Sequence, residues 1–82
     1  MWIKIRFLCA DISPDVGAGT LEVAEGASVA EVLAVCVKQY NIGIPLEQLM
    51  DSTFLIGKAH ARLDRVLSEG DELSVIRPLG GG

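Results

Sequence analysis

Histidine and cysteine, on which most metal sites and nucleophilic active sites depend, are scarce in this sequence. His60 is the only histidine, and the two cysteines, Cys9 and Cys36, form no C-x-x-C pair. No Ser or Cys stands out as a catalytic partner of His60, so we expect an ordinary surface residue. Cys36 falls in an apolar helical stripe and is expected to be a packed core thiol, and nothing beside Cys9 would activate it. We therefore expect a protein that is not an enzyme, with no metal site and no cofactor bound by the chain itself.

Basic residues are also few. The chain has 7 Lys and Arg against 11 Asp and Glu, a net charge of −4, and no basic run. Nucleic acids and anionic membranes bind through a basic footprint, so neither is an expected partner. By its net charge, the chain is expected to meet a protein with a basic groove.

Long hydrophobic runs are missing as well. The opening stretch, Met1–Leu8, is too short and too charged for a secretory leader or a membrane span. With two thiols and no such leader, we expect a cytoplasmic protein. The 82 residues, half of them hydrophobic, fit one small globular domain without internal repeats.

The first half of the chain predicts two strands and a helix. Alternation over Trp2–Leu8 and again over Thr20–Ala24 predicts two strands that pair as a hairpin, with Glu22 opposite Lys4 or Arg6. A capping box follows, in which Ser28 is the N-cap and Glu31 stands three residues later. Apolar residues then recur at helical spacing up to Tyr40, and Asn41, Gly43 and Pro45 end the helix.

The second half predicts three more strands. Thr53–Ile56 and Ala59–Leu63 are joined by a tight Gly57-Lys58 turn, and Glu72–Arg77 alternates once more. One helix must cover the apolar face of one sheet, because neither buries that face alone. With the first and last strands adjacent at the centre, the fold class is α+β: a ubiquitin-like β-grasp, one mixed sheet of about four to five strands under one main helix.

The chemistry is expected at the end of the chain. Pro78 stops the last strand, and three glycines, Gly80, Gly81 and Gly82, follow Leu79. Such a run costs backbone entropy and adds nothing to a core. One reading is a frayed end; the other is a tail that a second protein grips, with residues 1–79 as the folded body and 80–82 as the tail. Adenylation by ATP would turn the Gly82 carboxylate into an electrophile, which makes the tail a group carrier.

The sequence resembles the MoaD/ThiS-like sulfur-carrier family, which includes the small subunit of molybdopterin synthase and the thiamine-biosynthesis sulfur carrier. The residues that carry the resemblance are Glu69–Leu73 (EGDEL) and Val75–Gly82 (VIRPLGGG). The first strand, Gly17 and the helix opening at Ser28 match in order and spacing. The length and the Pro78-Leu79-Gly80 spacing look closest to the molybdopterin branch.

The resemblance implies a mechanism and a set of partners. An E1-like adenylyltransferase (MoeB/ThiF-like) would adenylate Gly82 with its own ATP and Mg, gripping Pro78, Leu79, Gly80 and Gly81. A sulfur donor, such as a cysteine desulfurase or rhodanese, would then convert the adenylate into a thiocarboxylate. A MoaE-like large subunit of molybdopterin synthase would receive the sulfur for molybdenum cofactor biosynthesis.

Docking on such partners is expected from the exposed sheet face. Ile76, Leu8 and Trp2 point away from the predicted core, and Arg77 adjoins the tail. We expect Ile76, Arg77 and Leu8 to form a partner-binding patch, because clustered exposed apolar residues mark interfaces. Two alternatives stay open: a thiamine-thiazole or other sulfur carrier, and a ubiquitin-like protein modifier or binding module.

Overall fold

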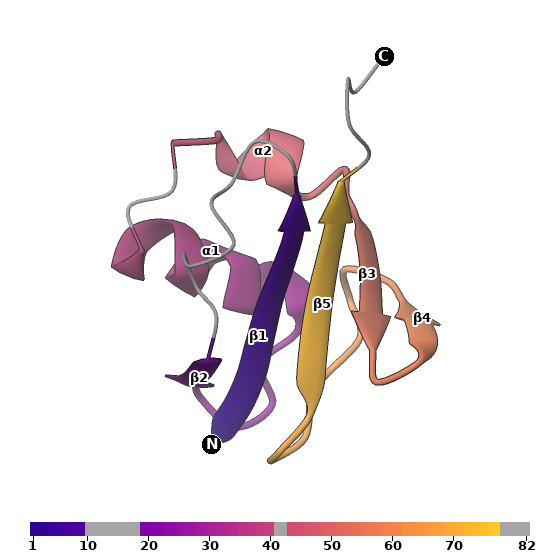
Figure 1. Ribbon diagram of the computed structural model, residues 1–82. Coiled ribbons are helices and arrows are strands. Elements are labelled where there is room, and N and C mark those ends of the chain that lie inside the picture. Colours follow the sequence, from indigo (N-terminus) through magenta and orange to yellow (C-terminus); the bar gives the residue numbers. More distant parts are fainter. Residues whose placement is uncertain (10–18, 41–42, 78–82) are drawn as a thin grey trace.

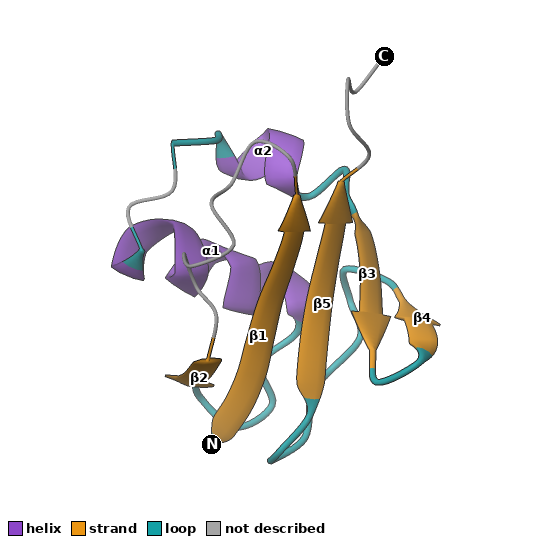
Figure 2. Cartoon of the chain, in the orientation of Figure 1, coloured by secondary structure: helices purple, strands orange, loops and turns teal. Residues whose placement is uncertain are grey.

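The computed structural model describes residues 1–9, 19–40 and 43–77, which form one sheet with two helices on one of its faces (Figure 1, Figure 2). The elements in chain order are β1 (Trp2–Cys9), β2 (Gly19–Glu22), α1 (Val29–Gln39), α2 (Leu46–Leu49), β3 (Thr53–Ile56), β4 (Ala59–Ala61) and β5 (Glu72–Arg77). All five predicted strands and the main helix are therefore present.

The sheet has the order β2-β1-β5-β3-β4 (Figure 1). β1 and β5 are parallel and central, while the β1–β2, β3–β5 and β3–β4 pairs are antiparallel. The first and last strands thus lie side by side, which confirms the predicted α+β architecture of the β-grasp. The Gly57-Lys58 turn joins Ile56 to its partner Ala59, and Gly57 has the positive φ, 63°, that the first position of such a turn requires.

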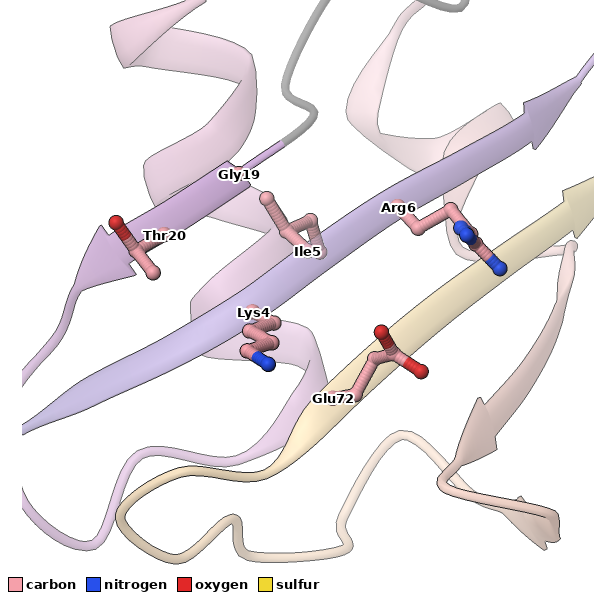
Figure 3. Close-up of a pocket in the computed structure, with 6 residues that line it drawn as sticks. All are labelled: Lys4, Ile5, Arg6, Gly19, Thr20 and Glu72. Atoms are coloured by element: carbon pink, nitrogen blue, oxygen red, sulfur yellow. The ribbon is translucent and has the colours of Figure 1, made fainter.

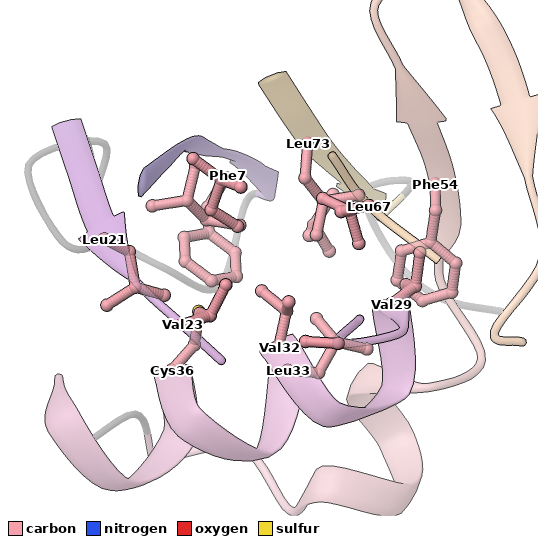
Figure 4. Packing of buried hydrophobic residues seen from close by; sticks show 14 of the residues in the cluster. Phe7, Leu21, Val23, Val29, Val32, Leu33, Cys36, Phe54, Leu67 and Leu73 are labelled. Carbon is pink, nitrogen blue, oxygen red and sulfur yellow. The ribbon is translucent and has the colours of Figure 1, made fainter. Parts of the chain in front are cut away.

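The core lies between the sheet and α1 (Figure 4). Alternate residues of β1, namely Ile3, Ile5 and Phe7, are buried on the helix side, because successive strand residues face opposite ways. The buried side chains of α1 are Val29, Val32, Leu33 and Cys36, which follow the helical period. Cys36 is fully buried in the core cluster, which confirms the expectation of a packed core thiol. This burial raises the pKa of its thiol to about 12.

The loop between β4 and β5 completes the start of α1. The N–H of Val29 donates to the carbonyl of Arg65 at 2.9 Å, and the N–H of Ala30 donates to that of Leu63 at 3.0 Å. Ser28 and Glu31 form the predicted capping box. Helix N-termini leave backbone donors without intrahelical partners, and here neighbouring backbone and the capping serine accept their hydrogen bonds. β4 ends at Ala61, two residues earlier than expected, since the following loop turns toward α1.

A second set of backbone contacts fixes β2 beside the start of β1. The terminal ammonium of Met1 donates to the carbonyl of Val23, and the N–H of Val23 donates back to the carbonyl of Met1. Glu22 consequently pairs with Trp2, so the expected position of Glu22 opposite Lys4 or Arg6 is wrong. Alternation fixed the face of Glu22 but allowed several registers.

Candidate functional site

The carboxyl end of β5 carries the predicted site. β5 ends at Arg77, and because β1 and β5 are parallel, this end also holds Leu8 and Cys9. Residue 78 is therefore joined to the body at the carboxyl end of the two central strands. The predicted acceptor Gly82, the predicted recognition residues Pro78, Leu79, Gly80 and Gly81, and the expected boundary after residue 79 all lie outside the described residues.

The face of the sheet turned away from the helices is called the outer face. Leu8 is 49% exposed there and pairs with Ile76 of β5, which in turn pairs with Thr53 of β3. Leu55 of β3 lies on the same face, because it is two residues along the strand from Thr53, and it pairs with Ser74. We call Leu8, Leu55 and Ile76 the apolar strip. It crosses three adjacent strands beside the point where the tail leaves the body.

The outer face also contains a buried serine. Ser74 of β5 is only 6% exposed, although it belongs to the outer face. Its register partners are Arg6 on one side and Leu55 on the other, and long side chains on neighbouring strands are close enough to cover a small one. Ser74 is therefore a buried residue of the outer face, next to the apolar strip.

Arg77 lies on the opposite face from the other two residues of the expected patch. It pairs with Cys9, and its neighbours two residues away in register, Val75 and Phe7, are core residues. By strand alternation the Arg77 side chain lies on the helix side, where it is partly buried. Leu8 and Ile76 are thus brought together, while the sheet separates them from Arg77.

Two other outer-face residues differ from the expectation. Trp2 is 51% exposed but pairs with Glu22 at the other end of β1, so Lys4 and Arg6 separate it from Leu8. The expected patch omitted Leu55, which strand pairing adds to it. Alternation within Thr53–Ile56 was the available signal, since Leu55 has the opposite parity to the buried Phe54.

The Gly-Asp-Glu turn before β5 has a structural role. Gly70 adopts a φ of 83° and donates its N–H to the Trp2 carbonyl, and the Glu69 carboxylate accepts from the Trp2 N–H at 3.0 Å. The Lys4 N–H donates to the Asp71 carbonyl at 2.8 Å, and the Asp71 carboxylate accepts from the Ser68 N–H at 2.8 Å. This turn aligns β5 with β1 and so sets the register that brings Ile76 opposite Leu8.

Within residues 1–9, 19–40 and 43–77, no group of three His, Cys, Asp or Glu side chains is placed to hold a metal ion. No helix in the described part of the chain has the length and apolar character needed to cross a membrane. His60 is exposed on β4 and pairs with Leu55, at the edge of the outer face.

Comparison with known proteins gives one family and several structural relatives. The ThiS family model matches residues 15–82 of the chain. No curated protein matches its sequence. Among solved structures, SAMP1 from Haloferax volcanii has a TM-score of 0.76 at 22% identity, with 100% of both chains covered.

Two further structures have the same fold. A Pyrococcus furiosus protein described as molybdopterin converting factor, subunit 1, has a TM-score of 0.65 at 16% identity, covering 95% of this chain and 98% of that one. Caldiarchaeum subterraneum ubiquitin has a TM-score of 0.55 at 21% identity, with both chains covered completely. At these identities the structures establish similarity of fold alone.

Proposed function

Because this chain belongs to the ThiS family of ubiquitin-like sulfur carriers, we propose that its Gly82 carboxylate is adenylated and then carries sulfur as a thiocarboxylate. The family match extends through the last glycine, and this observation carries the proposal. The body contributes two adjacent parallel strands, β1 and β5, and the tail follows β5 at the end where Leu8 and Ile76 of the apolar strip lie. A partner that binds the strip is thereby placed next to the start of the tail.

The chemistry is group transfer on one carbonyl carbon. An oxygen of the Gly82 carboxylate attacks the α-phosphorus of ATP held by an E1-like enzyme, and pyrophosphate leaves. The outer sulfur of a persulfide donor then attacks the acyl carbon, and AMP leaves with the oxygen. A second thiol attacks the donor's own sulfur in the resulting acyl disulfide, so that the S–S bond breaks, a disulfide forms between the two thiol sulfurs, and the thiocarboxylate is released. Glycine has no Cβ, so Gly80, Gly81 and Gly82 suit a narrow channel and an unhindered carbonyl. The chain itself is a substrate and carrier, and the ATP site belongs to its partner.

We place the carrier in molybdenum cofactor biosynthesis, as the small subunit beside a MoaE-like large subunit. Two observations support this branch: the Pro78-Leu79-Gly80 spacing, and the shared fold of the Pyrococcus furiosus protein whose description names molybdopterin conversion. We expect the reaction in the cytoplasm, where cysteine desulfurases and rhodanese-like proteins supply sulfur. A thiamine-thiazole carrier would use the same tail chemistry with a different acceptor.

A protein modifier is the second candidate. The fold is similar to that of SAMP1, which a second solved structure describes as a small archaeal modifier protein, and to that of an archaeal ubiquitin. These similarities favour a modifier. In that role the activated Gly82 carbonyl would be attacked by a lysine amine, which forms an isopeptide bond with loss of AMP. Both candidates need the same activated carboxylate, so they differ only in the nucleophile.

Intact mass spectrometry separates the two functions. The chain is incubated with an E1-like enzyme from the same genome, MgATP and a persulfide donor. A carrier gains about 16 Da, because one oxygen is replaced by sulfur. A modifier instead gives conjugates of higher mass on lysines when lysate protein is added. If the mass stays unchanged under both conditions, neither function holds.

A further inference from the structure

Trp2, the only tryptophan of the chain, is 51% exposed at the amino end of β1. A strand rises about 3.3 Å per residue, which puts Trp2 about 20 Å from Leu8, near the start of the tail. Between them on the outer face lies a shallow hollow of about 270 Å³, to which Lys4, Arg6 and Glu72 contribute (Figure 3). Trp2 is therefore separate from the apolar strip, and the proposed tail chemistry gives it no role.

Two carboxylates flank Trp2, one on each side of β1. Glu22 is its register partner on β2, and the Glu69 carboxylate accepts a hydrogen bond from the Trp2 N–H at 3.0 Å. Met1 and Val23 exchange both of their backbone hydrogen bonds. The next pair, Trp2 and Glu22, is therefore of the non-hydrogen-bonded kind, in which the side chains are closer. Since both glutamates are exposed, an exposed aromatic ring lies between two exposed carboxylates.

Two cations lie near Trp2, and each faces a group that compensates it. The Met1 ammonium donates a hydrogen bond to the Val23 carbonyl. Lys4 is two residues further along β1 and lies opposite Glu72 of β5, so these two charges offset each other (Figure 3). The charge that remains beside the Trp2 ring is negative.

An arginine side chain matches this arrangement. Its guanidinium is planar and stacks on aromatic faces, and among aromatic side chains tryptophan attracts cations most strongly. The same group donates two parallel hydrogen bonds to a carboxylate. A lysine ammonium lacks the planar fork, and an anionic partner would be repelled by the two glutamates.

We propose that Trp2, Glu22 and Glu69 form a docking site for an arginine side chain of a protein partner. The guanidinium stacks on the indole ring and donates to one of the two carboxylates. The net charge of the chain predicts a basic partner, and this site gives that partner one point of contact, about 20 Å from Leu8. The inference goes beyond the proposed function, since the tail chemistry involves none of these three residues.

The fluorescence of Trp2 tests the site directly, because no other tryptophan contributes to the signal. The probe is an arginine tetrapeptide blocked at both ends, titrated at low ionic strength beside blocked lysine and glutamate tetrapeptides. We expect a saturable change in emission with the arginine peptide and at least about twofold weaker binding of the lysine peptide. The glutamate peptide should not bind.

Matched variants locate the contact. Glu22→Gln and Glu69→Gln should each weaken binding of the arginine peptide about two- to fivefold, as expected when an exposed charged contact is lost. Glu47→Gln is the control, because it removes the same charge from an exposed position on α2 and should leave the affinity unchanged. Trp2→Leu, measured by calorimetry, should weaken binding at least about twofold. Circular dichroism melts check that each variant is folded.

Three results would overturn the proposal. The first is the absence of a saturable change with the arginine peptide. The others are equal affinity for the arginine and lysine peptides, and equal weakening by Glu22→Gln and Glu47→Gln, since both indicate attraction by net charge alone. A chain that ends at Gly80 should bind the arginine peptide as the full chain does, so the outcome is independent of sulfur loading.

Discussion

Gly70 donates its backbone N–H to the carbonyl oxygen of Trp2 over 2.7 Å, and it does so with a φ of 83°. This bond ties the turn before β5 to the start of β1, and the tail follows from the strand so aligned. The Glu69–Leu73 stretch, which carries part of the family resemblance, therefore has a structural role: it sets the register of two parallel strands.

Gly70→Ala should destabilise the fold by about 1–2 kcal/mol, because a positive φ is costly for a residue with a Cβ. An added Cβ would have no heavy atom within 4 Å, so the cost is conformational and not steric. Gly43→Ala is the matched control, since it also has open space but no positive φ. Urea unfolding measures both. Equal stability of the two variants would contradict the assigned role of Gly70.

Cys36 should be unreactive in the folded protein. Burial raises the pKa of its thiol from 9.0 to about 12, so little thiolate is present near pH 8. We expect iodoacetamide to alkylate a Cys9→Ser variant slowly without urea and rapidly in urea. Equal rates would show that the Cys36 thiol is accessible in the native state.

The same pKa shift predicts how stability depends on pH. Above pH 9 the unfolded chain releases the Cys36 proton while the native chain keeps it, so the unfolded state binds fewer protons. The contribution of this group to stability is complete below pH 9 and is lost as pH rises toward about 12. Cys36→Ala removes this part of the alkaline decline, which thermal melts at successive pH values measure.

The apolar strip should matter for docking and little for folding. Leu8→Asp is expected to raise the KM for adenylation at least about tenfold with kcat unchanged, because a charge would replace an apolar contact at the centre of the interface. Val35→Asp is the control, since Val35 is 36% exposed on α1, in the other layer. If the two variants behave alike, the outer face is not where the partner binds.

Apolar residues recur at every second position of β1 and β5, and alternate residues of a strand point to the same face. This pattern therefore identified which residues of each strand face the core. It placed Ile3, Ile5 and Phe7 inside and Leu8 outside, as the structure confirms. The capping box was equally local, since Ser28 and Glu31 are three residues apart. These features depend on neighbours in the chain, and the sequence contains them in full.

Features that depend on strand pairing were harder to predict. The register of β2 is set by backbone bonds between Met1 and Val23, which no side-chain pattern records. Alternation was sufficient to give Leu55 and Arg77 their faces, because Leu55 has the opposite parity to Phe54 and Arg77 has the same parity as Val75. Strand pairing was needed to show that Leu55 lies near Leu8 and Ile76. The hollow lined by Lys4, Arg6 and Glu72 combines residues from strands far apart in the chain, a grouping that net charge does not record.

The account depends on sulfur being attached to Gly82, so a change in the length of the tail should abolish sulfur loading and leave the stability of the folded body unchanged. A chain that ends at Gly80 should keep its unfolding free energy within about 0.5 kcal/mol of the wild type, since exposed termini contribute little. It should also gain no sulfur. A chain with one alanine added after Gly82 should likewise remain uncharged, because its terminal carboxylate lies one residue too far.

Tandem mass spectrometry of the C-terminal peptide, after reaction with the activating enzyme, MgATP and the persulfide donor, tests the central claim most directly. The account predicts a gain of about 16 Da confined to the Gly82 fragment, as expected when sulfur replaces a carboxylate oxygen. Sulfur found on Cys9 or Cys36 with an unmodified Gly82, or charging of the alanine-extended chain, would contradict it.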